Sequence, residues 1–164
     1  MDKVSFLNYL FYDLEKQRYN FYLQVSEKDG IKTKWKKFLD VFSDPNNPKN
    51  KWFIENCNQR QILPDEIVLD LEAREQLNPT LEKLKKFDYK FYVFDTGSRG
   101  YHIHIFFKKE LTVKEKELII NYFNADIMKA SEKTLIALEF SKHWKSGKIK
   151  DLIELKGGSL ENEN

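Results

Sequence analysis

The run from Asp95 to Phe107 constrains the fold of this chain more than any other segment. It reads Asp-Thr-Gly-Ser-Arg-Gly-Tyr-His-Ile-His-Ile-Phe-Phe, a polar turn with two glycines that leads directly into an alternating strand. Glycine permits the backbone conformations and the close approach that such a turn requires. Strand periodicity then places His102 and His104 on one face and their apolar neighbours on the other. We therefore expect a hairpin whose turn could meet an anionic group such as a triphosphate.

The turn itself carries several groups that suit a phosphate. Thr96 and Ser98 supply hydroxyls, and Arg99 supplies a guanidinium that can bind phosphate through two parallel hydrogen bonds. His102 is the histidine nearest the turn, so it is the better placed of the two to touch a ligand there. His104 lies one step further along the strand, and we expect it to be structural or to support the site. An ordinary exposed hairpin turn would show the same composition.

A second strand-like run lies upstream, from Glu66 to Glu72. Its residues Asp70 and Glu72 are separated by one position, so in a strand both carboxylates project from the same face. Two converging carboxylates repel each other unless a cation lies between them, and Mg²⁺ favours such oxygen ligands. A solvent-facing strand whose acids meet lysines across a sheet would produce the same pattern.

A third polar cluster spans Glu139 to Lys148. It contains three lysines and His143, and Lys145 is the lysine that follows this histidine most closely. Phosphates could meet His143 and Lys145, whereas a solvated basic loop is the plain structural explanation.

Composition limits the possible partners. The 164 residues fit one domain that could divide into two lobes, and the net charge of +2 confines any nucleic-acid surface to a local patch. Residues 32–37, which hold four lysines around Trp35, are the candidate patch. Cys57 is the single cysteine, which excludes an internal disulfide and a cysteine-rich zinc site and favours a reduced, cytoplasmic location. We also expect no membrane segment, because no apolar run approaches about 20 residues.

The order of elements predicts a mixed α/β (α+β) fold. Strands are expected at 67–72, 89–94, 101–107, 135–140 and 149–155, with a helix after the first of them and a second helix that begins with a capping box at Thr112 and Glu115. Strand, helix, strand, strand, helix, strand is the order of a split βαβ unit.

Taken together, the three polar clusters resemble the motifs of the archaeo-eukaryotic primase superfamily. Asp70-Leu71-Glu72 resembles its first motif, two acids separated by one residue after a hydrophobic strand. Thr96-Gly97-Ser98-Arg99-Gly100-Tyr101-His102 resembles its second, and Ser141-Lys142-His143-Trp144-Lys145-Ser146-Gly147 resembles its nucleotide-binding stretch. The resemblance covers about residues 60–156.

The resemblance implies a primase catalytic core in residues 1–156, followed by a polar tail at 157–164. Residues 61–156 would form a distorted RRM-like catalytic unit, and residues 1–60 a small N-terminal α/β unit. The chain lacks the zinc-binding module of many primase small subunits, so it is more similar to a plasmid- or virus-type core or to a minimal cellular, for example archaeal, version.

The resemblance also implies a reaction, DNA primase or primase-polymerase activity on a single-stranded DNA template with NTPs or dNTPs. Two divalent ions, Mg²⁺ or Mn²⁺, would be held by Asp70, Glu72 and Asp126, with Glu139 as the other candidate for the third acid. Thr96, Ser98, Arg99, His102, His143 and Lys145 would bind the triphosphate. A primase large subunit or a helicase would be a possible partner. The alternative is a non-catalytic RRM-like module that binds nucleic acid or nucleotides.

Overall fold

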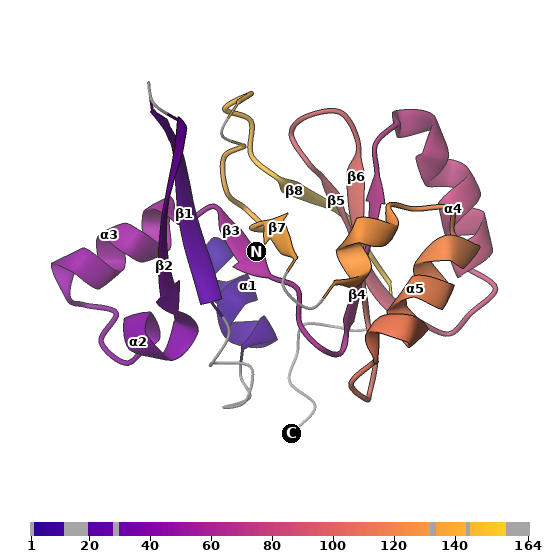
Figure 1. The fold of residues 1–164 in the computed structure, drawn as a ribbon, viewed down its shortest axis with the longest axis horizontal. Helices are drawn as coiled ribbons and strands as arrows, with labels where there is room; N and C mark the ends of the chain where they lie inside the picture. Colours follow the sequence, from indigo (N-terminus) through magenta and orange to yellow (C-terminus); the bar gives the residue numbers. More distant parts are fainter. Residues whose placement is uncertain (1, 12–19, 28–29, 132–133, 144, 157–164) are drawn as a thin grey trace. The chain divides into compact units, whose positions relative to one another are not determined.

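The computed structural model describes the whole chain except residues 1, 12–19, 28–29, 132–133, 144 and 157–164. The expected polar tail and Trp144 therefore lie outside the described residues. Two compact units are present, Met1–Gln61 with Leu135–Lys150, and Ile62–Thr134 with Asp151–Asn164. Helices and antiparallel sheets build both units (Figure 1), which confirms the predicted α+β class. None of the described helices is long and apolar enough to cross a membrane.

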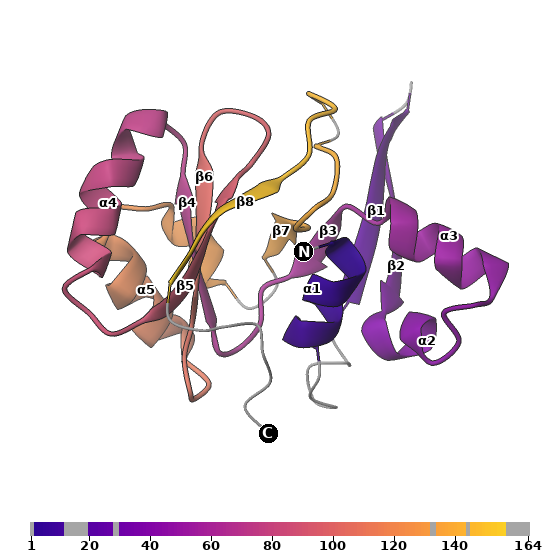
Figure 2. The ribbon, with the colours of Figure 1, turned by 180° about the vertical axis from the view of Figure 1, so that it is seen from behind.

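The described part of the first unit contains helices and an antiparallel sheet with the strand order β2-β1-β3-β7 (Figure 2). Its elements are α1 (Lys3–Leu10), β1 (Asn20–Glu27), β2 (Gly30–Lys37), α2 (Phe38–Phe42), α3 (Pro48–Asn56), β3 (Gln59–Gln61) and β7 (Leu135–Ala137). Its core is aromatic: the ring centroids of Phe11 and Phe38 lie 4.9 Å apart, and Phe21 packs against both rings. Burying large rings of this kind supplies much of the apolar stabilisation of a small unit.

The segment Leu135–Lys150 belongs to this first unit, whereas the sequence placed all of residues 61–156 in the second. Two contacts explain the difference. β7 extends the first sheet by pairing with β3, and the Ser141 hydroxyl donates a hydrogen bond to the Cys57 carbonyl at 3.1 Å. Such long-range pairing is set by tertiary packing and leaves no local signal.

The second unit is built around a sheet with the order β4-β6-β5-β8, in which every neighbouring pair is antiparallel. Its elements are β4 (Glu66–Leu71), the 3-10 helix η2 (Arg74–Gln76), α4 (Leu77–Leu84), β5 (Lys90–Asp95), β6 (Tyr101–Phe106), α5 (Val113–Tyr122), the 3-10 helix η3 (Ile127–Ala130) and β8 (Asp151–Lys156). The predicted capping box is confirmed, because Thr112 and Glu115 bond to each other's backbone at the start of α5.

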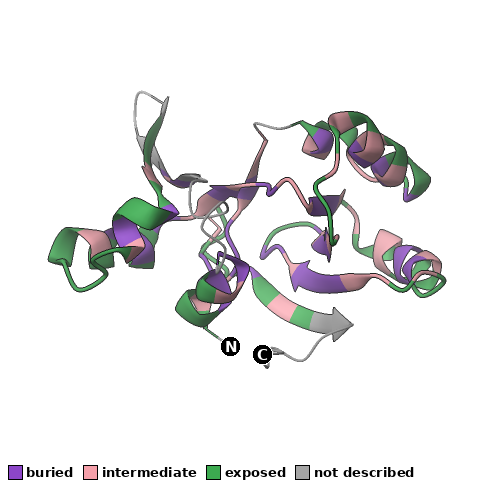
Figure 3. Cartoon of the chain, turned by 90° about the horizontal axis from the view of Figure 1, so that it is seen from below, coloured by how far each residue is buried: buried purple, intermediate pink, exposed green. Residues whose placement is uncertain are grey.

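The two faces of this sheet differ in chemistry. Alternate strand residues, among them Ile67, Val93 and Ile103, join the apolar core together with side chains of α4 and α5. Those helices lie on one side of the sheet in Figure 1, and in Figure 3 they carry buried and exposed residues on different faces. The intervening strand residues, which include Asp70 and His102, occupy the opposite face. The predicted alternation therefore places the polar strand residues on the face opposite to the helices, where they are largely buried beside Val68, Tyr92 and Phe94.

Candidate active site

Asp70 and Glu72 lie at the end of β4. The strand ends at Leu71, so Glu72 is the first residue after it, one residue short of the predicted strand. The Asp70 side chain is 21% exposed, and Glu72 is exposed. Asp70 is therefore held by the sheet, whereas Glu72 is open to solvent beside it.

Asp70 is paired with nitrogen groups rather than with other carboxylates. The register of β4 and β6 sets Asp70 opposite His102, and its Oδ1 lies 3.5 Å from His102 Nε2. Its Oδ2 lies 3.4 Å from the Nζ of Lys129, a residue of η3. Burial alone would raise the pKa of the Asp70 carboxyl, but the hydrogen bond and charge of His102, with those of Lys129, lower this pKa from 3.8 to about 2. Asp70 is thus ionised throughout the physiological pH range.

The proposed third acid, Asp126, has a local structural role. Its Oδ1 accepts a hydrogen bond from the Met128 backbone N–H at 3.0 Å, which caps η3. Within the described part of the chain, Asp70, Glu72 and Asp126 do not form a cluster whose ligand atoms all lie within 4.8 Å of one another. The structure therefore does not itself assemble the three predicted metal ligands.

The other candidate, Glu139, belongs to the first unit and is fully buried. Its two carboxylate oxygens accept hydrogen bonds from Arg60 at 3.0 and 2.7 Å, and the Lys150 Nζ lies 3.8 Å away. A buried carboxylate needs such partners, because an unpaired charge in the interior is costly. The ion pairs with Arg60 and Lys150 account for a carboxylate at position 139 without a role in metal binding. Asp126 therefore stays our prediction for the third ligand.

The turn from Thr96 to Gly100 connects β5 to β6, as the sequence predicted. Its polar groups largely hold the turn itself. The Thr96 hydroxyl donates to the Gly100 carbonyl at 3.0 Å and accepts from the Ser98 N–H at 3.3 Å, while the Gly97 N–H donates to Asp95 Oδ1 at 2.8 Å. Gly97 has a φ of 72°, which favours glycine. Thr96 is buried, so it shapes the turn, whereas Ser98 and Arg99 are exposed.

Gly100 brings this turn against the end of β4. A Cβ atom at Gly100 would lie 1.7 Å from the Leu71 carbonyl oxygen, a distance that no side chain can occupy. The absent side chain lets the turn approach the backbone between Asp70 and Glu72. The first and second motifs of the sequence are thus brought together within the second unit.

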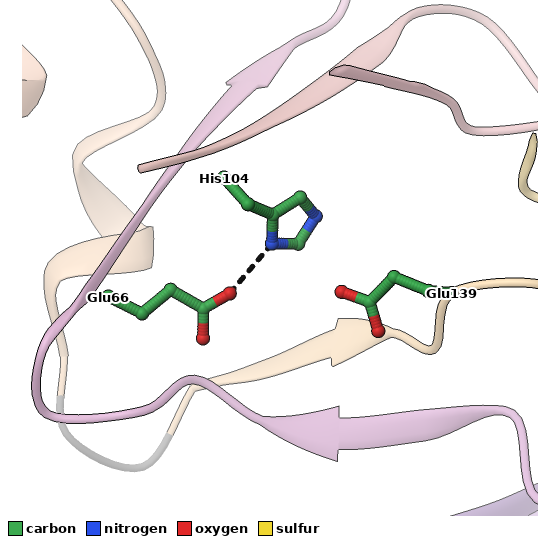
Figure 4. Close-up of side chains that lie close together, drawn as sticks. All are labelled: Glu66, His104 and Glu139. Atoms are coloured by element: carbon green, nitrogen blue, oxygen red, sulfur yellow. Dashed lines mark hydrogen bonds and ion pairs between the residues drawn. The ribbon is translucent and has the colours of Figure 1, made fainter. Parts of the chain in front are cut away.

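His104 forms a buried pair with Glu66. Its Nδ1 lies 2.7 Å from Glu66 Oε1, and neither side chain is exposed (Figure 4). The second carboxylate oxygen of Glu66 accepts the Leu63 backbone N–H at 2.9 Å, which fixes the acid in place. The arrangement agrees with a structural or supporting role for His104.

His143 has a defined orientation within the first unit. Its Nδ1 accepts hydrogen bonds from the backbone N–H groups of Lys145 and Ser146 at 3.3 and 3.2 Å. An Nδ1 that accepts cannot carry the proton of a neutral imidazole, so Nε2 carries it. His143 would therefore present an Nε2–H donor, and the side chain of Lys145 is exposed nearby in the loop. Their predicted contact with a triphosphate stays a prediction.

Two cations beside the predicted motifs carry no functional signal in the sequence. Lys129 meets Asp70, and Arg74 donates to Asp95 Oδ2 at 3.0 Å and to the Tyr101 hydroxyl at 2.9 Å. Lys129 lies three residues after the capping residue Asp126, a spacing that hints at a short helix but does not identify the acid that it reaches. Arg74 follows the acidic motif by two residues and gave no separate signal.

The sequence itself matches no protein-family profile and no curated protein. Among solved structures, the fold is similar to the polymerase domain of Mycobacterium tuberculosis Ligase D, determined in complex with DNA. The match has a TM-score of 0.53 and 10% sequence identity, and it covers 81% of this chain and 62% of the other. The chain thus shares a fold with that polymerase domain and spans less than two thirds of its length.

Proposed function

We propose that this protein is a template-directed nucleotidyltransferase of the primase-polymerase type, which extends a 3′-hydroxyl on single-stranded DNA with nucleoside triphosphates. One observation carries the proposal: a fold similar to that of a polymerase domain places the ionised Asp70 in register with His102, beside a glycine-dependent turn. Fold alone does not establish activity, so the proposal depends on the chemistry of these residues.

The donor chemistry fits a divalent cation such as Mg²⁺ or Mn²⁺. Asp70 is ionised and Glu72 is exposed, and Asp126 supplies a third carboxylate in the same unit. Hard cations prefer such oxygen ligands and complete their coordination with substrate phosphates and water. Bound ions would stabilise the charge on the attacking and leaving oxygens. A cysteine-rich zinc site does not fit, because the chain has one cysteine, Cys57, and it is buried.

The triphosphate would be held by the exposed end of the turn and by the histidine loop. Ser98 and Arg99 are exposed and can donate to phosphate oxygens, and His102 adjoins them at the start of β6. His143 would add its Nε2–H, and Lys145 a positive charge. Thr96 would act by shaping the turn, since its hydroxyl is used within it.

A primer-synthesis assay tests the proposal. Single-stranded template is incubated with Mg²⁺ or Mn²⁺ and with NTPs or dNTPs, and Asp70→Asn and Glu72→Gln are compared with Asp88→Asn and Glu82→Gln, which alter exposed acids elsewhere in the unit. We expect synthesis by the wild type and the two controls, and loss of synthesis in both site variants. Full activity of either site variant would overturn the assignment of that carboxylate.

One observation supports a second candidate, a module that binds nucleotides or nucleic acid without polymerising. Asp70 already has two nitrogen partners, and the three carboxylates do not cluster. Nucleotide binding that survives in Asp70→Asn, together with no synthesis by the wild type under any metal and nucleotide combination, would favour this candidate.

A further inference from the structure

The first unit contains a pocket of about 380 Å³ between β2 and α3. Its apolar lining includes Trp35 of β2 and Trp52 and Phe53 of α3. Phe53 is buried, but Trp35 is 58% exposed and Trp52 is 50% exposed. Two large aromatic side chains open to solvent at one pocket are characteristic of a binding surface.

The pocket lies at an open sheet edge. β2 is the last strand in the order β2-β1-β3-β7, so in the described part of the unit one of its edges carries no neighbouring strand. Alternation places Trp35 on the opposite face of β2 from Lys34 and Lys36, so the pocket lining continues around this edge. Lys36 is fixed on the α3 side, because its Nζ donates to Asn50 Oδ1 at 3.1 Å and lies 5.5 Å from the centre of the Phe53 ring.

The charge around the pocket is strongly positive. Lys34 and Lys49 line it and are exposed, and β2 and α3 carry further exposed lysines at positions 32, 37 and 51. The whole chain has a net charge of only +2, so positive charge is concentrated here. Lysines on an edge strand also prevent pairing with other chains, but that role gives no reason for the two exposed indoles.

We propose that the edge of β2 and the adjoining face of α3 bind single-stranded nucleic acid. Trp35 and Trp52 would be stacking platforms for unpaired bases, and Lys34 and Lys49 would contact the phosphates. Exposed aromatic rings combined with lysines are the means by which proteins hold single strands without reading their sequence. A duplex keeps its bases stacked and hidden, so it would use only the lysines. Binding of a single strand at this site does not depend on the proposed function. Only the inference that the bound strand is a template rests on it.

Binding of fluorescently labelled oligo-dT to the full chain, measured by anisotropy without metal or nucleotide, tests the site. We expect Trp52→Ala to weaken binding roughly five- to a hundredfold and Trp52→Phe to retain most of it, because phenylalanine preserves a stacking surface. Lys34→Gln with Lys49→Gln should reduce the slope of log affinity against log salt by about 1.4 in magnitude. The control is Lys86→Gln with Lys108→Gln, which removes the same charge from exposed positions in the second unit.

The outcomes separate this site from the proposed function. Circular dichroism first establishes that each variant is folded. Oligo-dT affinity unchanged in Trp52→Ala, or lowered equally by both lysine pairs, would overturn the site even if the protein synthesises primers. Binding that depends on Trp52 in a protein that synthesises nothing would support the site and reject the polymerase. Equal affinity for duplex and single strand, with no effect of Trp52→Ala, would also contradict it.

Discussion

Replacing Asp70 by Asn should destabilise the metal-free protein. If Asp70 lay among repelling carboxylates, removal of its charge would relieve the repulsion and raise the unfolding free energy. The structure pairs Asp70 with His102 and Lys129 instead. Asn removes the charge while keeping the size of the side chain, so Lys129 loses its ionic partner and no large cavity forms. We therefore expect the unfolding free energy to fall, opposite to the effect of relieving repulsion.

The pKa of Asp70 gives the magnitude. A folded-state pKa of about 2, against an ordinary value of 3.8, corresponds to roughly 2 kcal/mol of stability contributed by the ionised form. This equals a decrease of about 4–8 °C in Tm for a chain of this size. Because the folded state lowers the pKa, the contribution is fully present above about pH 4. It is lost as the pH falls from about 4 to about 2.

Urea unfolding with and without EDTA, at several values between pH 7 and pH 3, measures the effect. The difference between wild type and Asp70→Asn should be constant from pH 7 to pH 5 and should narrow below pH 4, while Asp88→Asn stays near wild type throughout. A double-mutant cycle with Lys129→Gln should show coupling between the two residues. Unchanged or increased stability of metal-free Asp70→Asn would refute the pairing and favour a site organised by charge repulsion.

Three further predictions follow from other contacts of the structure. Gly100→Ala should lower the unfolding free energy by about 1–3 kcal/mol, measured in urea, because a Cβ there overlaps the Leu71 carbonyl oxygen; wild-type stability would contradict the close approach. Glu139→Gln should lower the unfolding free energy by about 3–5 kcal/mol, because it breaks a buried ion pair. Asp126→Asn keeps a capping residue, so it should change stability little but abolish primer synthesis. Loss of synthesis in Glu139→Gln but not in Asp126→Asn would make Glu139 the third ligand. His143→Ala should raise the apparent KM for all four nucleotides alike and leave oligo-dT binding without nucleotide unchanged; loss of oligo-dT binding alone would assign His143 to the template.

Local patterns predicted much of the second unit. The alternation around His102 and His104 identified β6 and its polar face, and the capping box at Thr112 identified the start of α5. These features depend on side chains a few residues apart, so the sequence alone can reveal them. The glycines of the turn likewise predicted a hairpin, because positive φ and close approach are properties of glycine itself.

The partners of the site residues could not be predicted in the same way. Lys129 is 59 positions from Asp70 in the sequence, and their contact depends on how η3 packs beside β4. From the sequence, the Thr96 hydroxyl could bind either a phosphate or the turn itself. Only the geometry of the turn shows that it donates to the Gly100 carbonyl. Membership of Leu135–Lys150 in the first unit depends on strand pairing between distant segments, which residue periodicity does not encode.

The pairing of Asp70 with His102 across β4 and β6 has a consequence for how this site tolerates insertions and deletions. The hydrogen-bonding register between β4 and β6 brings the two side chains together, whatever the number of residues between them in the sequence. The helix α4 and the loops around it could therefore lengthen or shorten without separating the pair. A single residue inserted into β4 before Asp70 is different, because it shifts the strand by one position and turns every side chain on one side of the insertion to the other face. Length variation should therefore accumulate between β4 and β5, around α4, and be excluded within the strands and the turn that joins β5 to β6. A search for distant relatives would do best to align β4 with the β5–β6 hairpin and leave only the interval around α4 free.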